Sequence, residues 1–140
     1  MCYAIYVASD SPLDLIPWDL EDRKLNVSKI TARDEVIRSR FTKPHVYYVG
    51  SHLGCGCGFF YESSLGPEDD EKVVATEVKR SLEELKGYLR ESLVRSQELE
   101  LYVSWEGEKP TSPIKSVSLG VQSIQQLELH ERWFYVIGRI

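Results

Sequence analysis

The sequence predicts an α+β fold: a mixed, largely antiparallel sheet of about five to seven strands with one long helix packed on a face. Several short segments rich in β-branched and aromatic residues follow one another along the chain, as expected for strands. One segment has the apolar spacing of a long helix. The connections between neighbouring strand segments are short, which favours antiparallel pairing.

The first half of the chain predicts three strands and one short helix. The opening run is apolar on both faces, which is typical of a strand inside a sheet. Thr31 is a suitable helix cap, and acidic residues follow it in the first turn. The predicted elements are strands at 1–8, 24–30 and 45–50 and a helix from Thr31 to Phe41.

The long helix is predicted over residues 69–95. Its apolar residues recur every three or four positions and therefore share one helix face. These residues are Val74, Val78, Leu82, Leu85, Leu89 and Leu93. The acidic run Glu68–Glu71 is interpreted as the start of this helix, because carboxylates are favourable at the positive end of the helix dipole.

The last third of the chain predicts further strands. Residues 98–105 alternate between apolar and more polar positions, which indicates a strand with one buried face. A loop at 106–113, a weaker strand at 114–121 and a final strand over 127–137 follow.

A glycine-rich segment provides the candidate site. Gly54-Cys55-Gly56-Cys57-Gly58 is predicted to be a loop between strand 45–50 and a strand that resumes at Phe59. In an extended segment, Cys55 and Cys57 would project to one side with Cα atoms about 6.6 Å apart. Glycine also permits positive φ, so the loop can curl and bring both sulfur atoms toward one metal ion.

Two further ligands are candidates for the same metal ion. His52 stands three residues before Cys55. Cys2 lies at the start of the first strand, and antiparallel pairing with strand 45–50 would place it beside the loop. Three cysteines and one histidine form a closed tetrahedral set that is typical of structural zinc. Zinc is therefore the candidate cofactor, with Cys55, Cys57, Cys2 and His52 as its ligands.

Two alternatives to metal binding stay open. Cys55 and Cys57 are also suitably spaced for thiol–disulfide chemistry, with glycine-loop N–H groups to lower a thiol pKa. Alternatively, the cysteines are inert small hydrophobes in a structural or partner-binding module. The sequence identifies no catalytic residue and no site for an organic cofactor, so whether the protein is an enzyme stays open.

Length and charge limit the classes of function. The 140 residues, with a net charge of −5, predict a single α+β domain over 1–140 and argue against a nucleic-acid partner. No apolar run is long enough to cross a membrane, and no signal peptide is evident, which predicts a cytoplasmic protein. A protein partner and homo-oligomerisation both stay open.

The chain resembles a family of small uncharacterised bacterial proteins. The resemblance covers most of the chain and includes Met1-Cys2, Ile16-Pro17-Trp18 and Tyr48-Val49-Gly50-Ser51. Its most specific part is Gly54-Cys55-Gly56-Cys57-Gly58-Phe59. The resemblance implies a bacterial cytoplasmic protein and implies no particular activity.

Overall fold

The computed structural model describes residues 2–105 and 112–139, and its centre is a six-stranded mixed sheet. The strands are β1 (Tyr3–Ser9), β2 (Asn26–Lys29), β3 (His45–Gly50), β4 (Glu98–Trp105), β5 (Lys115–Gly120) and β6 (Trp133–Gly138). Their order across the sheet is β2-β3-β1-β4-β6-β5. Neighbours pair antiparallel except β5 and β6, which are parallel. The predicted α+β fold class is confirmed.

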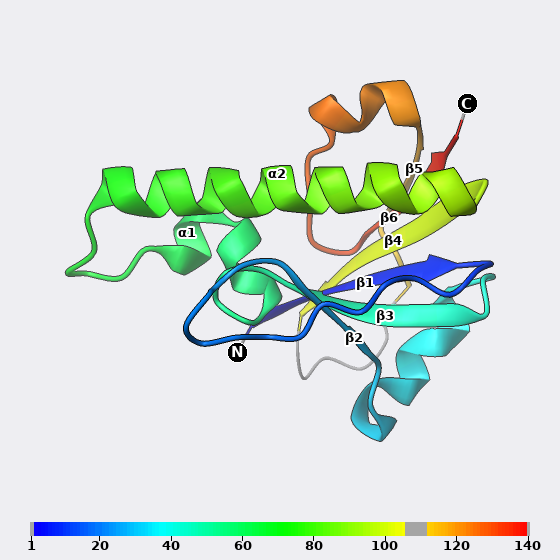
Figure 1. The fold of residues 1–140 in the computed structure, drawn as a ribbon, viewed down its shortest axis with the longest axis horizontal. Helices are drawn as coiled ribbons and strands as arrows, with labels where there is room; N and C mark the ends of the chain where they lie inside the picture. The colour runs from blue at the N-terminus through cyan, green and yellow to red at the C-terminus, as the bar shows by residue number, and fades with distance from the viewer. Residues whose placement is uncertain (1, 106–111, 140) are drawn as a thin grey trace.

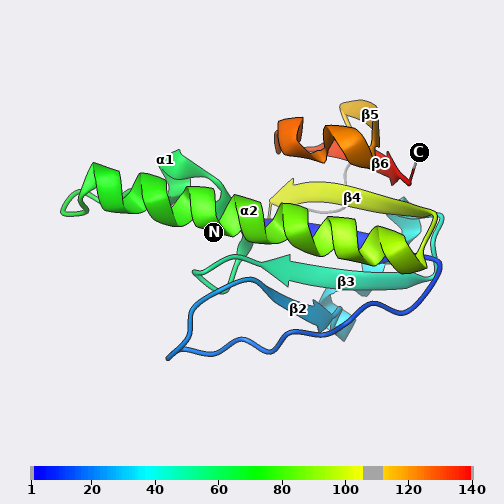
Figure 2. The same ribbon diagram turned by 45° about the horizontal axis from the view of Figure 1, so that its top comes forward.

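One long helix crosses one face of this sheet (Figures 1 and 2). The helical elements are the 3₁₀ helices η1 (Ala32–Arg40), η2 (Gly56–Phe59) and η3 (Val121–Gln126) and the α-helices α1 (Tyr61–Ser64) and α2 (Glu71–Arg95). Helix η1 lies on the opposite side of the sheet from α2 (Figure 1). The first turns of α2 extend past the strands, with α1 beside them (Figure 1).

The predicted long helix is confirmed to within two residues at its start. Asp70 caps α2, because its side chain accepts hydrogen bonds from the backbone N–H groups of Lys72 and Val73. Five of the six stripe residues are buried, and Leu82 is half-buried. The part of the stripe from Leu82 to Leu93 packs into the core beneath α2.

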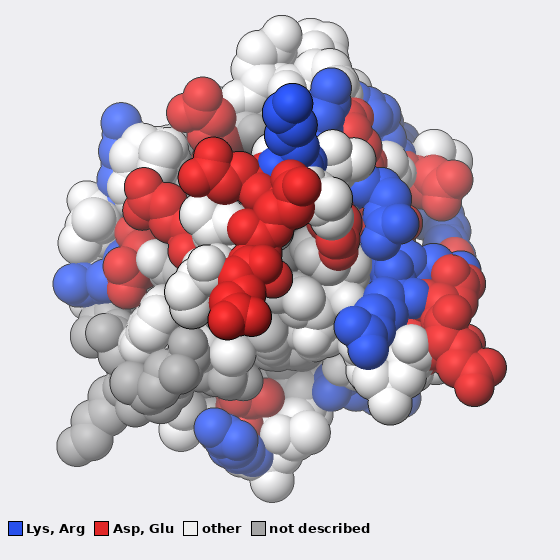
Figure 3. Space-filling view, turned by 90° about the vertical axis from the view of Figure 1, so that its left-hand side faces the viewer, with Lys and Arg blue, Asp and Glu red and all other residues white. Residues whose placement is uncertain are grey.

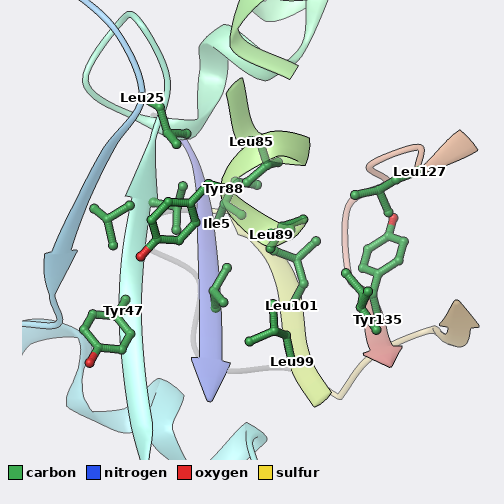
Figure 4. Packing of buried hydrophobic residues seen from close by; sticks show 14 of the residues in the cluster. Ile5, Leu25, Tyr47, Leu85, Tyr88, Leu89, Leu99, Leu101, Leu127 and Tyr135 are labelled. Carbon is green, nitrogen blue, oxygen red and sulfur yellow. The ribbon is translucent and has the colours of Figure 1, made fainter. Parts of the chain in front are cut away.

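The core lies on both faces of β1, as its uniformly apolar sequence predicts. Ile5 and Val7 belong to the larger core cluster beneath α2, together with Leu85 and Leu89 of that helix (Figure 4). On the opposite face, Tyr6 and its neighbours pack with Ile37 of η1 and related residues. Burial on both faces fixes the position of β1, and with it the position of Cys2.

Three predicted elements differ from the structure. The helix predicted at 31–41 is the 3₁₀ helix η1. The strand predicted to resume at Phe59 is absent, because both edges of β3 are already paired, with β2 and with β1, and residues 56–64 form η2 and α1 instead. The final strand begins at Trp133 rather than 127. The loop predicted at 106–113 lies mostly outside the described residues.

Candidate metal centre

The sheet topology brings the chain's start to the glycine-rich loop. Strands β1 and β3 are antiparallel, with Ile5 opposite Val49. The start of β1 therefore lies beside the end of β3, where the loop begins. This is the pairing that the prediction for Cys2 required.

Three sulfur atoms meet at this point. The Sγ atoms of Cys2, Cys55 and Cys57 all lie within 4.8 Å of one another. Cys57 is buried, whereas Cys2 and Cys55 are partly exposed, and all three are free thiols. The backbone N–H of Tyr3 donates a hydrogen bond to Cys57 Sγ at an N···S distance of 3.3 Å. Two chain segments more than fifty residues apart thus supply one sulfur cluster.

The local backbone differs from the predicted extended loop. Cys55 is extended, but Cys57 lies inside the 3₁₀ helix η2. Ser51 holds Cys55 in place, because its backbone N–H and its Oγ both donate to the Cys55 carbonyl oxygen, at 2.8 and 2.7 Å. The Cys57 carbonyl oxygen accepts hydrogen bonds from Ser63 Oγ at 3.1 Å and from Ser64 Oγ at 2.9 Å. Hydrogen bonds to their carbonyl oxygens therefore hold both cysteines in place. The alternating side-chain directions of an extended strand, which the sequence predicted, do not apply here.

Glycine at position 56 permits the close approach of the loop to β1. A Cβ atom there would lie 2.6 Å from the Tyr3 carbonyl oxygen and 3.1 Å from Ile5 Cγ1. Because a carbonyl oxygen in a central strand cannot move aside easily, only glycine fits without a shift of the loop. This close approach allows Cys55 and Cys57 to lie beside Cys2.

Burial changes the acidity of the thiols. It raises the pKa of the Cys55 thiol to about 12, against a backbone hydrogen bond from Cys57 that lowers it. Burial likewise raises the pKa of the Cys57 thiol, while the hydrogen bond from the Tyr3 N–H opposes this rise. Both thiols are protonated at neutral pH when no metal ion is present. A bound metal ion would reverse this preference, because it deprotonates the thiols that coordinate it.

The structure places His52 away from the three cysteines. Its Nδ1 lies 2.6 Å from Ser81 Oγ, and its Nε2 lies 3.3 Å from a carboxylate oxygen of Glu77. The His52 backbone N–H also donates to Ser81 Oγ at 3.2 Å. Burial lowers the pKa of His52, and the Glu77 charge opposes this effect. Among the described residues, the cluster of potential metal ligands consists of the three cysteines alone.

Sequence reasoning missed the partners of His52 on α2. Glu77 and Ser81 are four residues apart, so they lie on one face of the helix. This spacing is visible in the sequence, but it does not indicate which residue the helix faces. Near the cysteines, the aromatic side chains of Tyr3, Phe60 and Trp105 are only partly buried.

Comparison of the chain with protein-family models, with curated proteins and with solved structures finds no match. The resemblance to the bacterial family with the glycine–cysteine motif therefore stays a prediction. Among the described residues, no helix has both the length and the apolar character required to span a membrane. The arrangement of side chains is thus the basis for assigning a function.

Proposed function

We propose that Cys2, Cys55 and Cys57 bind a thiophilic metal ion, with zinc as the first candidate. One observation carries the proposal: the three Sγ atoms lie within 4.8 Å of one another. In a tetrahedral zinc site with Zn–S bonds of about 2.3 Å, sulfur atoms are about 3.8 Å apart. Small side-chain rotations are sufficient to close this difference.

The donor set suits a soft or borderline metal ion. Thiolates prefer zinc and Cu(I) over the hard cations magnesium and calcium. The N–H of Tyr3 donates to Cys57 Sγ, and such hydrogen bonds orient and stabilise thiolate ligands in metal sites. Each cysteine that coordinates as a thiolate releases one proton, so binding becomes tighter as the pH rises.

The proposal does not include His52 as a ligand. Both of its ring nitrogens have partners on α2, so recruiting one to the metal would leave Ser81 or Glu77 without its contact. Three protein ligands leave a fourth position for water or another small ligand, as in zinc sites that are not closed.

Thiol–disulfide chemistry is less well supported than metal binding. Reactive cysteines are normally thiolates near neutral pH. Burial raises the pKa of both Cys55 and Cys57, and no lysine or arginine stands within nine residues of Cys55 on either side. Inert cysteines are the remaining alternative, and the metal measurement below tests it directly.

Metal analysis of protein purified without chelator tests the proposal. We expect one zinc ion or other thiophilic ion per chain in the reduced wild type and substoichiometric metal in Cys2→Ser, Cys55→Ser and Cys57→Ser. Substitution by Co(II) should produce thiolate-to-cobalt charge-transfer absorption that each serine variant weakens. Reduced wild-type protein that binds neither zinc, copper nor Co(II) would overturn the proposal.

The His52→Gln variant separates the three-cysteine site from the four-ligand site. We expect His52→Gln to keep its metal ion, because the imidazole is engaged by α2. If a folded His52→Gln protein loses the ion, His52 is a metal ligand after all. Circular dichroism of each variant checks that any metal loss does not follow from unfolding.

A further inference from the structure

A second candidate site lies beside the cysteines and does not depend on metal binding. An open groove of about 670 Å³ runs between the start of β1, the end of β4 and helices α1 and α2. Aromatic side chains form much of its wall, and aliphatic side chains of α2 complete it. The lining includes Tyr3, Phe60, Tyr61, Val78, Leu82 and Trp105. Its volume is within the range of small-molecule sites, about 300–1,000 Å³.

The aromatic rings are held in place before any ligand binds. Tyr3 and Trp105 are opposite each other in the β1–β4 register, and their rings meet edge to face at 4.6 Å. Phe60 also packs against Tyr3, at a ring-centroid distance of 4.2 Å. All three side chains are partly exposed, and Tyr61 beside them is 38% exposed. The groove thus presents pre-arranged aromatic surface to solvent.

A carboxylate borders this aromatic surface. Glu62 lines the groove directly, and no lysine or arginine is among the described residues that line it. The pKa of Tyr3 is raised, first by burial, then by the Glu131 carboxylate, the Cys57 thiol and the Glu62 carboxylate. Both carboxylates therefore lie near enough to the Tyr3 hydroxyl to raise its pKa. Figure 3 views the end of the molecule that carries α1 and the start of α2; carboxylate side chains gather near the middle of this face, and Lys and Arg side chains lie to one side of them.

The adjoining surface has a different character. A smaller groove of about 390 Å³ shares Tyr61, Val78 and Leu82 with the first, but Lys79, Lys86 and Glu83 of α2 also line it. Its two lysines outnumber its one carboxylate, so a positively charged group is less favourable there than near Tyr3 and Trp105. The charge difference gives a bound molecule a defined orientation.

We propose that the groove between Tyr3, Phe60 and Trp105 binds a small organic cation whose ammonium group lies against these rings and near Glu62. Aromatic faces attract cations through the ring quadrupole, and quaternary ammonium ions are the typical ligands of such sites. An aliphatic tail on the cation would extend along Val78 and Leu82.

Titration with hexyltrimethylammonium tests this proposal. The matched probes are 1-hexanol, which keeps the tail without charge, and hexanoate, which carries the opposite charge. We expect saturable binding of the cation, about tenfold tighter than that of the alcohol, and weaker binding of the anion. Tryptophan fluorescence and calorimetry report the binding, and Trp105→Phe identifies the fluorescence change that belongs to the groove.

Charge variants show whether binding occurs at this groove. Glu62→Gln should weaken binding of the cation by a few-fold while leaving hexanol unaffected. Glu21→Gln changes the net charge equally at an exposed position outside the groove lining and should have no effect. These variants change surface residues, so their folding is not at issue.

Three outcomes would overturn the proposal. Equal affinity for hexyltrimethylammonium and hexanol would mean that the groove recognises only apolar surface. Equal weakening in Glu21→Gln would mean that the cation binds to the overall negative charge. A concentration-dependent dimer that shields Trp105 from a fluorescence quencher would mean that a second copy of the chain covers the groove. The proposed metal site is unaffected by any of these results.

Discussion

The segment from Ser51 to Phe60 carries different chemistry on its two sides. On one side, Cys55 and Cys57 meet Cys2 from the start of β1. On the other side, His52 contacts Glu77 and Ser81 of α2. Both sides contain side chains that commonly bind metal ions, and the sequence predicted that His52 and the cysteines bind the same ion.

Hydrogen bonding distinguishes the two sides. One tautomer of His52 satisfies every contact: Ser81 Oγ accepts the His52 backbone N–H and donates to Nδ1, while Nε2–H donates to Glu77. Thiols are weak donors and acceptors, so hydrogen bonds alone contribute little to holding three of them together. The position of His52 is therefore explained by its hydrogen bonds to α2. The hydrogen bonds of the thiols do not explain the sulfur cluster in the same way, and a bound metal ion would explain it.

Gly56→Ala should disrupt the cluster of three cysteines and should have the largest effect on stability and on metal content. The new Cβ would lie 2.6 Å from the Tyr3 carbonyl oxygen, so the loop must move away from β1. We expect a loss of about 2–3 kcal/mol in the free energy of unfolding and a loss of bound metal. Urea denaturation and metal analysis measure the two effects. Full metal occupancy in a destabilised Gly56→Ala protein would show that the sulfur cluster tolerates movement of the loop.

Ser81→Ala should weaken the histidine side alone. It removes the partner of both the His52 backbone N–H and Nδ1, in a position that is fully buried. We expect the free energy of unfolding to fall by about 2 kcal/mol, with metal stoichiometry unchanged. Thr76→Ala is a matched control, because Thr76 is exposed on the same helix and its hydroxyl donates to the Lys72 carbonyl oxygen. Metal loss in folded Ser81→Ala would show that the two sides are coupled.

The pH dependence of stability should identify His52. Burial lowers its pKa in the folded state below the ordinary value of 6.5. The unfolded chain therefore binds the proton more readily, so the stabilising contribution is present above pH 6.5 and is lost as the pH falls toward the lowered value. We expect His52→Gln to flatten the fall in stability as the pH drops below 6.5. An unchanged profile would assign this dependence to other groups.

Particular residues show which parts of this arrangement the sequence predicts. The strand at 98–105 and the stripe from Val74 to Leu93 depend on local periodicity, and both elements are confirmed. The expectation that the strand has only one buried face is wrong, because Glu100 and Tyr102 on its other face are buried as well. The sequence predicted that Cys2 lies beside the loop only if β1 pairs antiparallel with β3. The parallel pairing of β5 with β6, and the direction in which His52 turns, depend on which elements pack together. Local patterns carry no information about those contacts.

Gly87→Ala should have the smallest effect and should be stabilising. Gly87 lies in the middle of α2, and a Cβ atom there would meet nothing within 4 Å. Because alanine restricts the unfolded chain and favours the helix, we expect a gain of about 0.5–1 kcal/mol in the free energy of unfolding, with no change in metal content. Thermal denaturation measures this gain. The same measurement on Gly56→Ala compares a glycine that a close contact requires with one that no contact requires. Destabilisation by Gly87→Ala would mean that α2 needs flexibility at this turn to reach both the loop and the sheet.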